Sequence, residues 1–408
     1  MATFFGNLRS MKLLHTADWH LGQILRGYGR AEEQREAMAQ VVGIAGEEQA
    51  DVMVVAGDVF DTGNPPVEAQ ELYFETLVQL RRQCPRMEIV VVAGNHDAAG
   101  RLEAPREVLW FVDVHVVGNV KWKNGQMETA GRLVKVSNRE GVRVGSVLAV
   151  SYPTARCLPA MNDEDGERRL PRMVARLYQE MAERTRGEWE PWPLVVTGHL
   201  HVRGGEESPG AERGILIGGE DAAPVTVFPP EAAYVALGHL HKAQRMDGER
   251  VQYSGSLIPL SATEAGYEHG VTVVEIAGRT VVSRRRVLRR GTGFFRIPER
   301  GFLPWGEVEG ALAGLGGGMP FAQVKLRREG LPVGYREELD AMAERAGVRL
   351  VEVKLEETER GKSAGFGERV TELQPGELFR RAFFDKHGKE PEERHRQVFE
   401  RVKEQVEA

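Results

Sequence analysis

The first hundred residues alternate short, unbroken apolar runs with longer amphipathic stretches. Apolar runs at 12–15, 51–56 and 88–93 predict strands that are buried on both faces. The stretches at 31–48 and 67–82 carry apolar side chains along one side and predict helices. Strands of this kind, joined by helices of this length, are typical of a parallel sheet covered on both faces, with right-handed crossovers.

From about residue 130 the chain changes to many short apolar runs separated by turns, with one helix predicted over about 167–186. The predicted strands lie at 142–150, 194–197, 215–217, 225–228, 234–237, 250–254 and 271–276. We expect them to form a second, mixed or antiparallel sheet that packs on the first. Two stacked sheets with helices outside give an α/β (α+β) fold, a four-layer α/β/β/α sandwich over residues 11–290.

The organisation changes again after the basic segment 283–290, SRRRVLRR. Glycines and prolines follow, and then a strand, a helix and a strand are predicted at 321–327, 336–346 and 348–355. We expect a small α/β domain over residues 291–356. Residues 357–373 have the composition of a linker, and residues 374–408 predict two short helices. Residues 1–10 precede the first strong strand and are expected to be a flexible or untranslated extension.

Composition and charge mainly exclude certain classes of protein. The chain has 408 residues, of which 41% are hydrophobic and 28% charged, which suits two to four globular domains. Its 54 basic and 60 acidic side chains give a net charge of −6, which excludes a uniformly basic nucleic-acid coat but not a local basic stripe. The longest aliphatic runs have about five residues, far short of the roughly 20 that span a bilayer.

Cysteine usage indicates a reducing compartment. Cys84 and Cys157 are the two cysteines and lie far apart in the sequence. Neither a disulfide framework nor a thiolate zinc finger fits this spacing, and a reducing cytosol does. The first residues lack the apolar core and cleavage site of a signal peptide. We therefore expect a cytoplasmic protein with no membrane partner.

Five short motifs carry the candidate chemistry, and nearly all of them follow predicted strands. They are Asp18-Trp-His20, Gly57-Asp58, Gly94-Asn95-His96-Asp97, Gly198-His199 and Gly238-His239-Leu240-His241. Ligand-binding groups of open α/β sheets collect at the carboxyl ends of the strands, and a glycine lets the chain turn sharply there. The motifs supply carboxylates, imidazoles and one amide, a ligand set that suits Mn²⁺, Fe²⁺ or Zn²⁺.

The number of ligands indicates a pair of ions. The seven candidate ligands are Asp18, His20, Asp58, Asn95, His199, His239 and His241. Two neighbouring ions need roughly eight protein contacts with one shared carboxylate, and a bridging Asp58 closes that count. Such a pair clamps a phosphate and lowers the pKa of bound water from about 15.7 toward 7. His96 is then left to contact the phosphate or protonate the leaving oxygen, with Asp97 to orient its ring.

Longer segments around these motifs resemble the calcineurin-like metallophosphoesterases, and within them the bacterial SbcD branch of nuclease subunits. The segments are HTADWHLGQ (15–23), VVAGDVFDTGNPP (54–66), VVAGNHD (91–97), VTGHLH (196–201), ALGHLHKAQ (236–244) and YSGSLIPLS (253–261). The resemblance implies one ion held by Asp18, His20, Asp58 and His241. It implies a second held by Asp58, Asn95, His199 and His239, with His96 as the catalytic histidine. Manganese is the implied ion, and Mg²⁺, Fe²⁺ or Zn²⁺ would also fit.

The resemblance also implies partners. The domain at 291–356 would cap DNA, and 374–408 would be a helix-loop-helix that docks on the coiled coil of SbcC, an SMC-like ATPase, in a heterotetramer. The sequence holds no G-x-x-x-x-G-K-[ST] motif, so any ATP dependence comes from that partner. The implied activity is exonuclease cleavage of double strands and endonuclease cleavage of single strands and hairpins. Its implied setting is DNA repair, recombination and replication at the nucleoid.

The same branch pairs its nuclease domains into homodimers. The helices at 67–82 and 102–111 are the candidates for that contact. The residues that could form it, or equally could belong to the core, are Tyr73, Phe74, Leu77, Leu109 and Trp110.

Several assignments stay open. Asp61 stands where archaeal and eukaryotic relatives carry a histidine, which favours the bacterial branch. His201 forms a second H-x-H with His199, but the ligand count closes without it, and we expect it to line the cleft. Residues that either contact DNA or serve only structure are Arg26, Tyr28 and Arg30, and the basic cluster Arg284, Arg285, Arg286, Arg289 and Arg290. A small-molecule phosphoesterase and an architectural DNA-end tether are the alternative functions.

Overall fold

The structure is a computed structural model that describes residues 10–123, 126–159, 169–208, 212 and 222–356. It also describes six single residues nearer the C-terminus, namely 379, 380, 383, 391, 395 and 399. The chain forms two compact units, Met1–Lys354 and Leu355–Ala408. The expected extension apart from residue 10, the strand at 215–217, the linker at 357–373 and nearly all of the tail at 374–408 lie outside the described residues.

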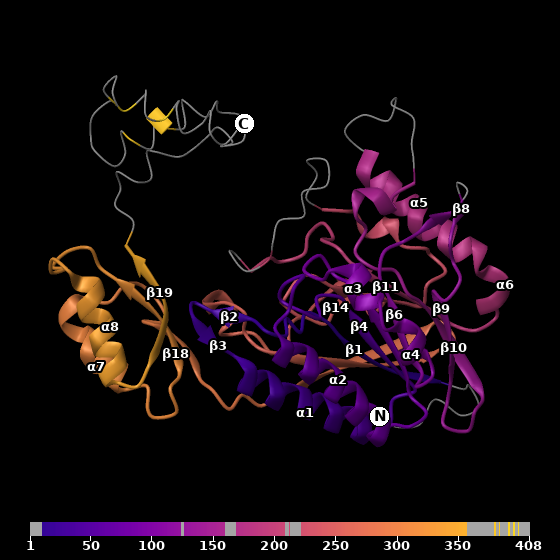
Figure 1. Ribbon diagram of the computed structural model, residues 1–408, viewed down its shortest axis with the longest axis horizontal. Coiled ribbons are helices and arrows are strands. Elements are labelled where there is room, and N and C mark those ends of the chain that lie inside the picture. Colours follow the sequence, from indigo (N-terminus) through magenta and orange to yellow (C-terminus); the bar gives the residue numbers. More distant parts are fainter. Residues whose placement is uncertain are drawn as a thin grey trace. The chain divides into compact units, whose positions relative to one another are not determined.

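The first unit is built on two six-stranded sheets (Figure 1). The first sheet has the order β16-β15-β1-β4-β5-β6, in which β1, β4, β5 and β6 are parallel and β15 and β16 are antiparallel additions. Its strands are β1 (Met11–Thr16), β4 (Val52–Ala56), β5 (Glu88–Val92), β6 (Val114–Val117), β15 (Gly270–Ala277) and β16 (Thr280–Val287).

The second sheet has the order β13-β14-β12-β11-β10-β9. Strands β10, β11, β12 and β14 are parallel, and β9 and β13 run antiparallel at the two edges. Its strands are β9 (Leu133–Ser137), β10 (Arg143–Leu148), β11 (Leu194–His199), β12 (Tyr234–Gly238), β13 (Gln244–Asp247) and β14 (Val251–Tyr253).

Helices cover the outer faces of both sheets, which confirms the predicted four layers. Helices α1 (Ala31–Glu48) and α2 (Val67–Gln83) pack on the first sheet, and α5 (Arg169–Arg184) packs on the second. The described part also contains shorter elements: β2 (Ile24–Leu25), β3 (Tyr28–Gly29), α3 (Ala99–Glu103), α4 (Arg106–Trp110), β7 (Trp122–Lys123), β8 (Gln126–Met127), η1 (Ala155–Cys157), α6 (Arg186–Trp189), η3 (Val225–Val227) and η4 (Ala262–Glu264).

The central strand β4 shows why its sequence has no polar alternation. Val52, Val54 and Ala56 face the core between the two sheets. Met53 and Val55 face the core under α1 and α2. All five side chains are 0% exposed, so both faces of the strand must be apolar.

Two of the predictions for strands are wrong. The strand at 271–276, which was expected in the second sheet, is β15 of the first sheet, where it pairs antiparallel with β1. The other is the predicted strand at 225–228. Residues 225–228 form the 3₁₀ helix η3, in which the backbone N–H of Val227 donates to the carbonyl of Pro224 at 3.1 Å. Val225 directly follows Pro224, and Pro229 comes after the turn. Proline has no N–H to give to a sheet ladder, so the apolar run between the two prolines turns instead of pairing.

A third, smaller sheet of order β17-β18-β19 follows the two large ones. Its elements are β17 (Phe294–Ile297), η5 (Trp305–Glu307), α7 (Val308–Ala313), β18 (Phe321–Leu326), α8 (Tyr335–Arg345) and β19 (Arg349–Leu355). Phe321 meets the Tyr28 ring at 6.2 Å, and the Arg30 guanidinium lies 5.0 Å above the Phe321 ring. Strand β17 and helix α7 lie in sequence for which only glycine- and proline-rich connections were expected.

In the second unit, the described aromatic side chains contact one another. Phe379 stacks on Phe399 with the ring centroids 4.5 Å apart, and Phe383 meets the His395 ring at 4.7 Å. Phe379 and Phe383 precede residues 386–388, and the other two follow them. Among the described residues of the whole chain, no helix is both long and apolar enough to cross a bilayer.

A buried histidine joins the two large sheets. His15 of β1 is 0% exposed, and both of its ring nitrogens reach β12. Its Nε2 donates to the carbonyl of Leu237 at 3.1 Å, so its Nδ1 accepts the hydroxyl proton of Tyr234 at 2.9 Å. Burial lowers the pKa of His15 from 6.5 to about 3, and the charge of Arg285 adds to that effect. The ring therefore stays neutral in the folded protein.

This neutral histidine predicts an acid-sensitive link between the sheets. Because the pKa of His15 is lower in the folded chain, its stabilising contribution is full above pH 6.5 and is lost as the pH falls toward 3. Each pH unit below 6.5 costs about 1.4 kcal/mol, so the loss at pH 5 is about 2 kcal/mol. We expect His15→Gln to lower the free energy of unfolding by about 1–3 kcal/mol at pH 7.5. The difference in this free energy between wild type and variant should be smaller at pH 5.

The measurement is urea unfolding of the metal-free wild type and variant at both pH values. Groups that titrate in both proteins cancel in the comparison, which isolates His15. A difference in the free energy of unfolding that is the same at pH 7.5 and pH 5 would contradict a neutral, buried imidazole.

Candidate metal centre

The seven predicted ligands lie at the carboxyl ends of strands from both large sheets. In the first sheet, Asp18 and His20 follow β1, Asp58 follows β4 and Asn95 follows β5. In the second, one histidine ends β11 and two follow β12, namely His199, His239 and His241. The parallel strands of each sheet bring these loops to one edge, and the stacking of the sheets brings the two edges together.

Three of the ligands that the resemblance gives to one ion form a tight group. Asp18, His20 and His241 each offer one donor atom, and these atoms lie within 4.8 Å of one another. All three residues are at most 4% exposed. A second such group consists of His20, Asp58 and His96, so the first ion's four expected ligands are neighbours.

The ligands expected for the other ion are also in contact. Nε2 of His199 lies 2.9 Å from Oδ1 of Asn95 and 3.3 Å from Oδ2 of Asp58. Nδ1 of His239 lies 3.3 Å from the same Asn95 oxygen. The structure therefore brings all seven predicted ligands together, in two groups that meet at Asp58.

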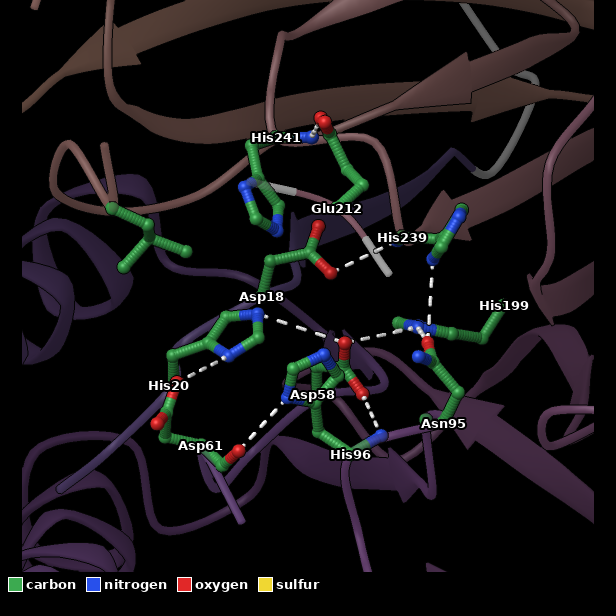
Figure 2. A network of polar contacts seen from close by, with 12 residues as sticks. Asp18, His20, Asp58, Asp61, Asn95, His96, His199, Glu212, His239 and His241 are labelled. Carbon is green, nitrogen blue, oxygen red and sulfur yellow. Dashed lines mark hydrogen bonds and ion pairs between the residues drawn. The ribbon is translucent and has the colours of Figure 1, made fainter. Parts of the chain in front are cut away.

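Asp58 lies between the two groups (Figure 2). Its Oδ2 is 3.6 Å from Nε2 of His20 and 3.3 Å from Nε2 of His199. Its Oδ1 accepts the backbone N–H of His96 at 2.8 Å. With the side chain 2% exposed, the carboxylate faces one histidine from each set, as a bridging ligand would.

The backbone is strained at the ligands themselves. Asp18, His20, Asp58 and His239 have φ angles of 53°, 44°, 50° and 104°. Residues other than glycine seldom adopt positive φ, and such strain persists where the surrounding structure fixes it, often at functional sites. Hydrogen bonds fix it here, because the N–H groups of Asp18 and His20 donate to the carbonyls of Gly57 and Asp58 at 3.0 Å.

Two glycines are required by the closeness of the loops. A Cβ on Gly94 would lie 2.1 Å from Oδ1 of Asp58, and one on Gly57 would lie 2.2 Å from Nδ1 of His199. Gly57 also has a φ of +92°, as expected for a turn directly after a strand. Glycine at these positions therefore lets the β4 loop approach His199 of β11 and lets the β5 loop approach Asp58.

Hydrogen bonds to Nδ1 set the orientation of the predicted histidine ligands. Nδ1 of His199 donates to the carbonyl of Ala56 at 2.8 Å, and Nδ1 of His20 lies 3.2 Å from Oδ1 of Asp61. Nδ1 of His241 lies 3.0 Å from Oε1 of Glu264. With the hydrogen on Nδ1, Nε2 carries the lone pair that a metal needs.

The charges of the site are strongly coupled. Burial raises the pKa of Asp18 to about 6, although neighbouring histidines oppose that shift. Burial would also raise the pKa of Asp58, but His199, His20 and His96 hold it far below its usual range. Burial alone would lower the pKa of His199, yet the Asp58 carboxylate raises it to about 9. In the metal-free protein the imidazolium therefore takes the place of a cation beside Asp58.

Two buried polar atoms also favour a metal. Oδ2 of Asp18 and Nε2 of His20 are inaccessible to solvent and have no hydrogen-bond partner in the described part of the chain. An unpaired buried carboxylate oxygen is costly. Oxygen and imidazole donors around such atoms are the ligand set of a divalent transition ion, so these residues fit the dimetal site.

His96 lies at the edge of this centre, and its partner is not the one predicted. Nδ1 of His96 donates to the carbonyl of Asp61 at 2.8 Å, and the ring meets that of His20 at 4.7 Å. The carboxylate of Asp97 instead accepts the backbone N–H groups of Val59, Phe60 and Gly94, at 3.2, 3.0 and 2.8 Å.

The prediction that Asp97 orients the His96 ring is therefore replaced. The three N–H groups that Asp97 accepts belong to the loops after β4 and β5, which carry Asp58 and Asn95. Asp97 ties these two loops together, and Asp61 aligns the catalytic candidate through its carbonyl and His20 through its carboxylate.

Most of the side chains predicted to contact DNA bind other residues of the chain. Arg30 is 1% exposed and donates to Glu33, Gln23 and the carbonyl of Pro259, so its assignment to a DNA surface is wrong. Tyr28 is half-buried against the small sheet, and Arg26 is exposed.

The basic cluster of β16 holds the strand to α1. Arg284 and Arg286 form ion pairs with Glu48, and Arg286 also reaches Glu47 at 2.5 Å. Arg285 donates to the hydroxyl of Thr272 at 3.1 Å and to the carbonyl of Glu268 at 3.1 Å. Contact between this cluster and DNA stays a prediction.

His201 lies beside the centre, and its role as a residue of the cleft wall stays a prediction. Its ring centroid is 6.4 Å from that of His239, and its Nδ1 pairs with Oε1 of Glu207 at 3.0 Å.

The candidate dimer residues divide by exposure. Tyr73, Leu77 and Leu109 are buried in the core under the first sheet, with exposures of 1%, 3% and 9%. Phe74 of α2 and Trp110 of α4 are 40% and 56% exposed. Any contact through these helices therefore uses the latter two and not the former three.

Sequence reasoning missed two carboxylates at His241. Glu264 contacts its ring, and Oε1 of Glu212 accepts its backbone N–H at 3.2 Å. Glu264 ends a Ser-x-x-Glu pattern that starts at Ser261, which is typical of the cap of a helix. This pattern could have identified Glu264 as a candidate capping residue, but not His241, 23 residues earlier, as its partner.

Comparisons with known proteins agree with this geometry. A sequence model of the calcineurin-like phosphoesterase family matches residues 11–243, which include all seven predicted ligands. The chain is 40% identical to SbcD of the SbcCD nuclease of Rhodobacter capsulatus over 383 residues, covering 91% of this chain and 94% of that protein. The chain belongs to the SbcD family of calcineurin-like phosphoesterases.

Two further SbcD relatives match over a shorter region. SbcD of Bacillus subtilis and SbcD of Escherichia coli are 36% and 37% identical to this chain over 274 residues, covering 65% and 64% of it. The matches span 66% and 65% of those proteins. As a member of the SbcD family with this site, the chain is a metal-dependent hydrolase of phosphodiester bonds.

Because His199 and His241 are charged in the metal-free protein, we expect metal loading to release protons. Burial opposes protonation of His199 and His241, but Asp58 and Glu264 raise the pKa of each to about 9. Both rings are thus protonated on both nitrogens at pH 7.5 in the metal-free protein, and a cation must displace the Nε2 proton. We expect release of about one to two protons per chain, and weaker metal binding as the pH falls.

Calorimetric titration in buffers of different ionisation enthalpy measures this number directly. Binding heats that do not change with the buffer would show that no proton leaves, and His199 and His241 would then be neutral in the metal-free protein.

Proposed function

We propose that this chain is a DNA nuclease that hydrolyses phosphodiester bonds at DNA ends with two Mn²⁺ ions. The observation that carries the proposal is the convergence of six other ligand-type side chains around the buried Asp58, in a chain similar along 91% of its length to a nuclease component. One ion would be held by Asp18, His20, Asp58 and His241, and the other by Asp58, Asn95, His199 and His239. Bound cations of this kind clamp the phosphate and activate a water molecule.

The side chains of the protein supply positioning and one proton. Nδ1 of His96 donates to the carbonyl of Asp61 at 2.8 Å, which fixes the orientation of the ring at the edge of the centre. In this position the ring contacts the phosphate or gives a proton to the leaving oxygen. The hydrogen bonds of Asp97 to the β4 and β5 loops hold Asp58, Asn95 and the backbone of His96 in register.

The rest of the chain supports a macromolecular substrate. About 120 residues follow the two large sheets, and the small sheet of β17, β18 and β19 packs on Tyr28 beside the loop that carries His20. A small phosphomonoester needs no such domain. We propose that 291–356 caps DNA and that 374–408 docks on the coiled coil of an SbcC-like SMC ATPase in a heterotetramer, in the cytoplasm at the nucleoid.

The test is cleavage of labelled linear duplex, hairpin and single-stranded DNA, compared with nitrophenyl phosphate, in Mn²⁺. We expect cleavage of the DNA substrates, and we expect His96→Leu to lower the rate by about 10²–10⁴-fold while two Mn²⁺ still bind. The control is His115→Leu, which removes an imidazole that pairs with Glu88 outside the centre. Preferential hydrolysis of the nitrophenyl ester would favour a small-molecule phosphoesterase, and full activity of the His96 variant would remove this residue from the mechanism.

We also propose a homodimer through helices α2 and α4 and the turn after α4, with Phe74 and Trp110 as the exposed aromatic side chains of the two helices. Val108, Trp110, Phe111 and Val112 are 73%, 56%, 92% and 45% exposed, an apolar surface that a partner would cover.

For this dimer we expect Phe111→Glu to convert the chain to monomers, because a buried carboxylate without a partner is expensive at an apolar interface. Sedimentation velocity of the full chain gives the measurement. Val333→Glu is the matched control, since Val333 is fully exposed in the small domain. A Phe111 variant that sediments as a dimer would place the interface elsewhere.

A further inference from the structure

A buried carboxylate lies directly behind one of the proposed metal ligands. Glu264 ends the short helix η4 and is 0% exposed. Its Oε1 lies 3.0 Å from Nδ1 of His241 and accepts the hydroxyl of Ser261 at 3.2 Å. Its Oε2 accepts the backbone N–H of Leu260 at 2.9 Å. Both oxygens therefore have partners, and the side chain has no solvent to turn toward.

A second buried histidine fixes the backbone around this carboxylate. Nε2 of His269 donates to the carbonyl of Glu264 at 3.1 Å, so Nδ1 of the same ring accepts the hydroxyl of Ser256 at 3.1 Å. The backbone N–H of Ser256 in turn donates to the carbonyl of His241 at 3.1 Å. The hydrogen bonds thus form a closed ring, and a buried polar network that is fully satisfied specifies one arrangement.

This network decides which nitrogen of His241 can bind a cation. An ionised carboxylate is only an acceptor, so the hydrogen of the pair lies on Nδ1. Nε2 is then the nitrogen that can donate a lone pair. One ring nitrogen of His241 lies within 4.8 Å of donor atoms of Asp18 and His20. The side chains of Asn95 and His239, which belong to the other ion's set, hydrogen-bond to each other and to His199 rather than toward Glu264. The backbone N–H of His239 donates to Oδ1 of Asp18.

We propose that Glu264 is a positioning residue that fixes the ring of His241 and keeps its Nε2 available to one of the two cations. The proposal rests on the dimetal centre proposed above. The proposed effect is specific to one of the two ions, because Glu264 acts on the ion shared by Asp18, His20 and His241 and leaves the other ion unaffected. Partners of this kind behind a metal-binding histidine typically change metal affinity by 10–100-fold.

The alternative is that Glu264 only caps the short helix after Ser261. The two roles differ in what Glu264→Gln disturbs. The amide keeps the size of the side chain but replaces one oxygen by an NH₂ group. That group must face either the N–H of Leu260 or Nδ1–H of His241, and both of those are donors.

Calorimetric titration of the full metal-free chain with Mn²⁺ separates these roles. We expect the wild type to bind two ions, and Glu264→Gln to bind one ion with unchanged affinity and the other about 10–100-fold more weakly. Glu264→Asp draws the carboxylate back from the ring by one methylene and retains its charge, so it should show the same selective loss. It replaces the first variant if that one does not fold.

The matched control is Glu88→Gln. Glu88 at the start of β5 forms another Glu–His pair, with Oε2 2.8 Å from Nε2 of His115, at the opposite end of the strand from Asn95. This variant should bind both ions as the wild type does. Wild-type affinity for both ions in the Glu264 variants, or equal weakening of both, would overturn the positioning role. A wild type that binds fewer than two ions would instead overturn the proposed dimetal function.

Discussion

The structure depends on the burial of a single carboxylate among imidazoles. Asp58 is 1% exposed and is faced by histidines from both large sheets. An isolated carboxylate at such a place would be expelled or protonated, so it persists because positive charge surrounds it. In the metal-free chain the imidazolium of His199, whose pKa the Asp58 carboxylate raises to about 9, supplies that charge, and a bound cation would supply it in the loaded protein. The site is preorganised for metal because its charge balance already requires a cation.

The two-sheet architecture brings opposite loops to that carboxylate. Parallel strands put their carboxyl ends at one edge, and stacking two such sheets doubles the number of loops that meet. The cost of this crowding is visible in the positive φ angles of Asp18, His20, Asp58 and His239. His15 between the sheets and Asp97 between the loops are polar contacts that hold this strained edge in place.

Much of this arrangement was predictable because it lies in local patterns. Strands such as β4 and β5 are apolar on both faces, and candidate ligands follow them directly, so the layers and the convergence of the seven candidate ligands could be predicted along the chain. The local turn of the backbone and the direction of individual side chains could not be predicted in this way. The apolar run at 225–228 has the composition of a strand, and only its flanking prolines give the 3₁₀ turn. Asp97 follows His96 in the sequence, yet its carboxylate turns toward the backbone of other loops. Arg30 and Glu264 find partners that sequence spacing does not indicate.

The central claim is that two divalent cations share the Asp58 carboxylate. Diffraction from crystals equilibrated with Mn²⁺, recorded at the manganese absorption edge, measures this without reference to activity. The account predicts two anomalous peaks per chain, one on each side of Asp58, with His20 and His241 at one and His199 and His239 at the other. A single peak, or none at saturating manganese, would contradict it.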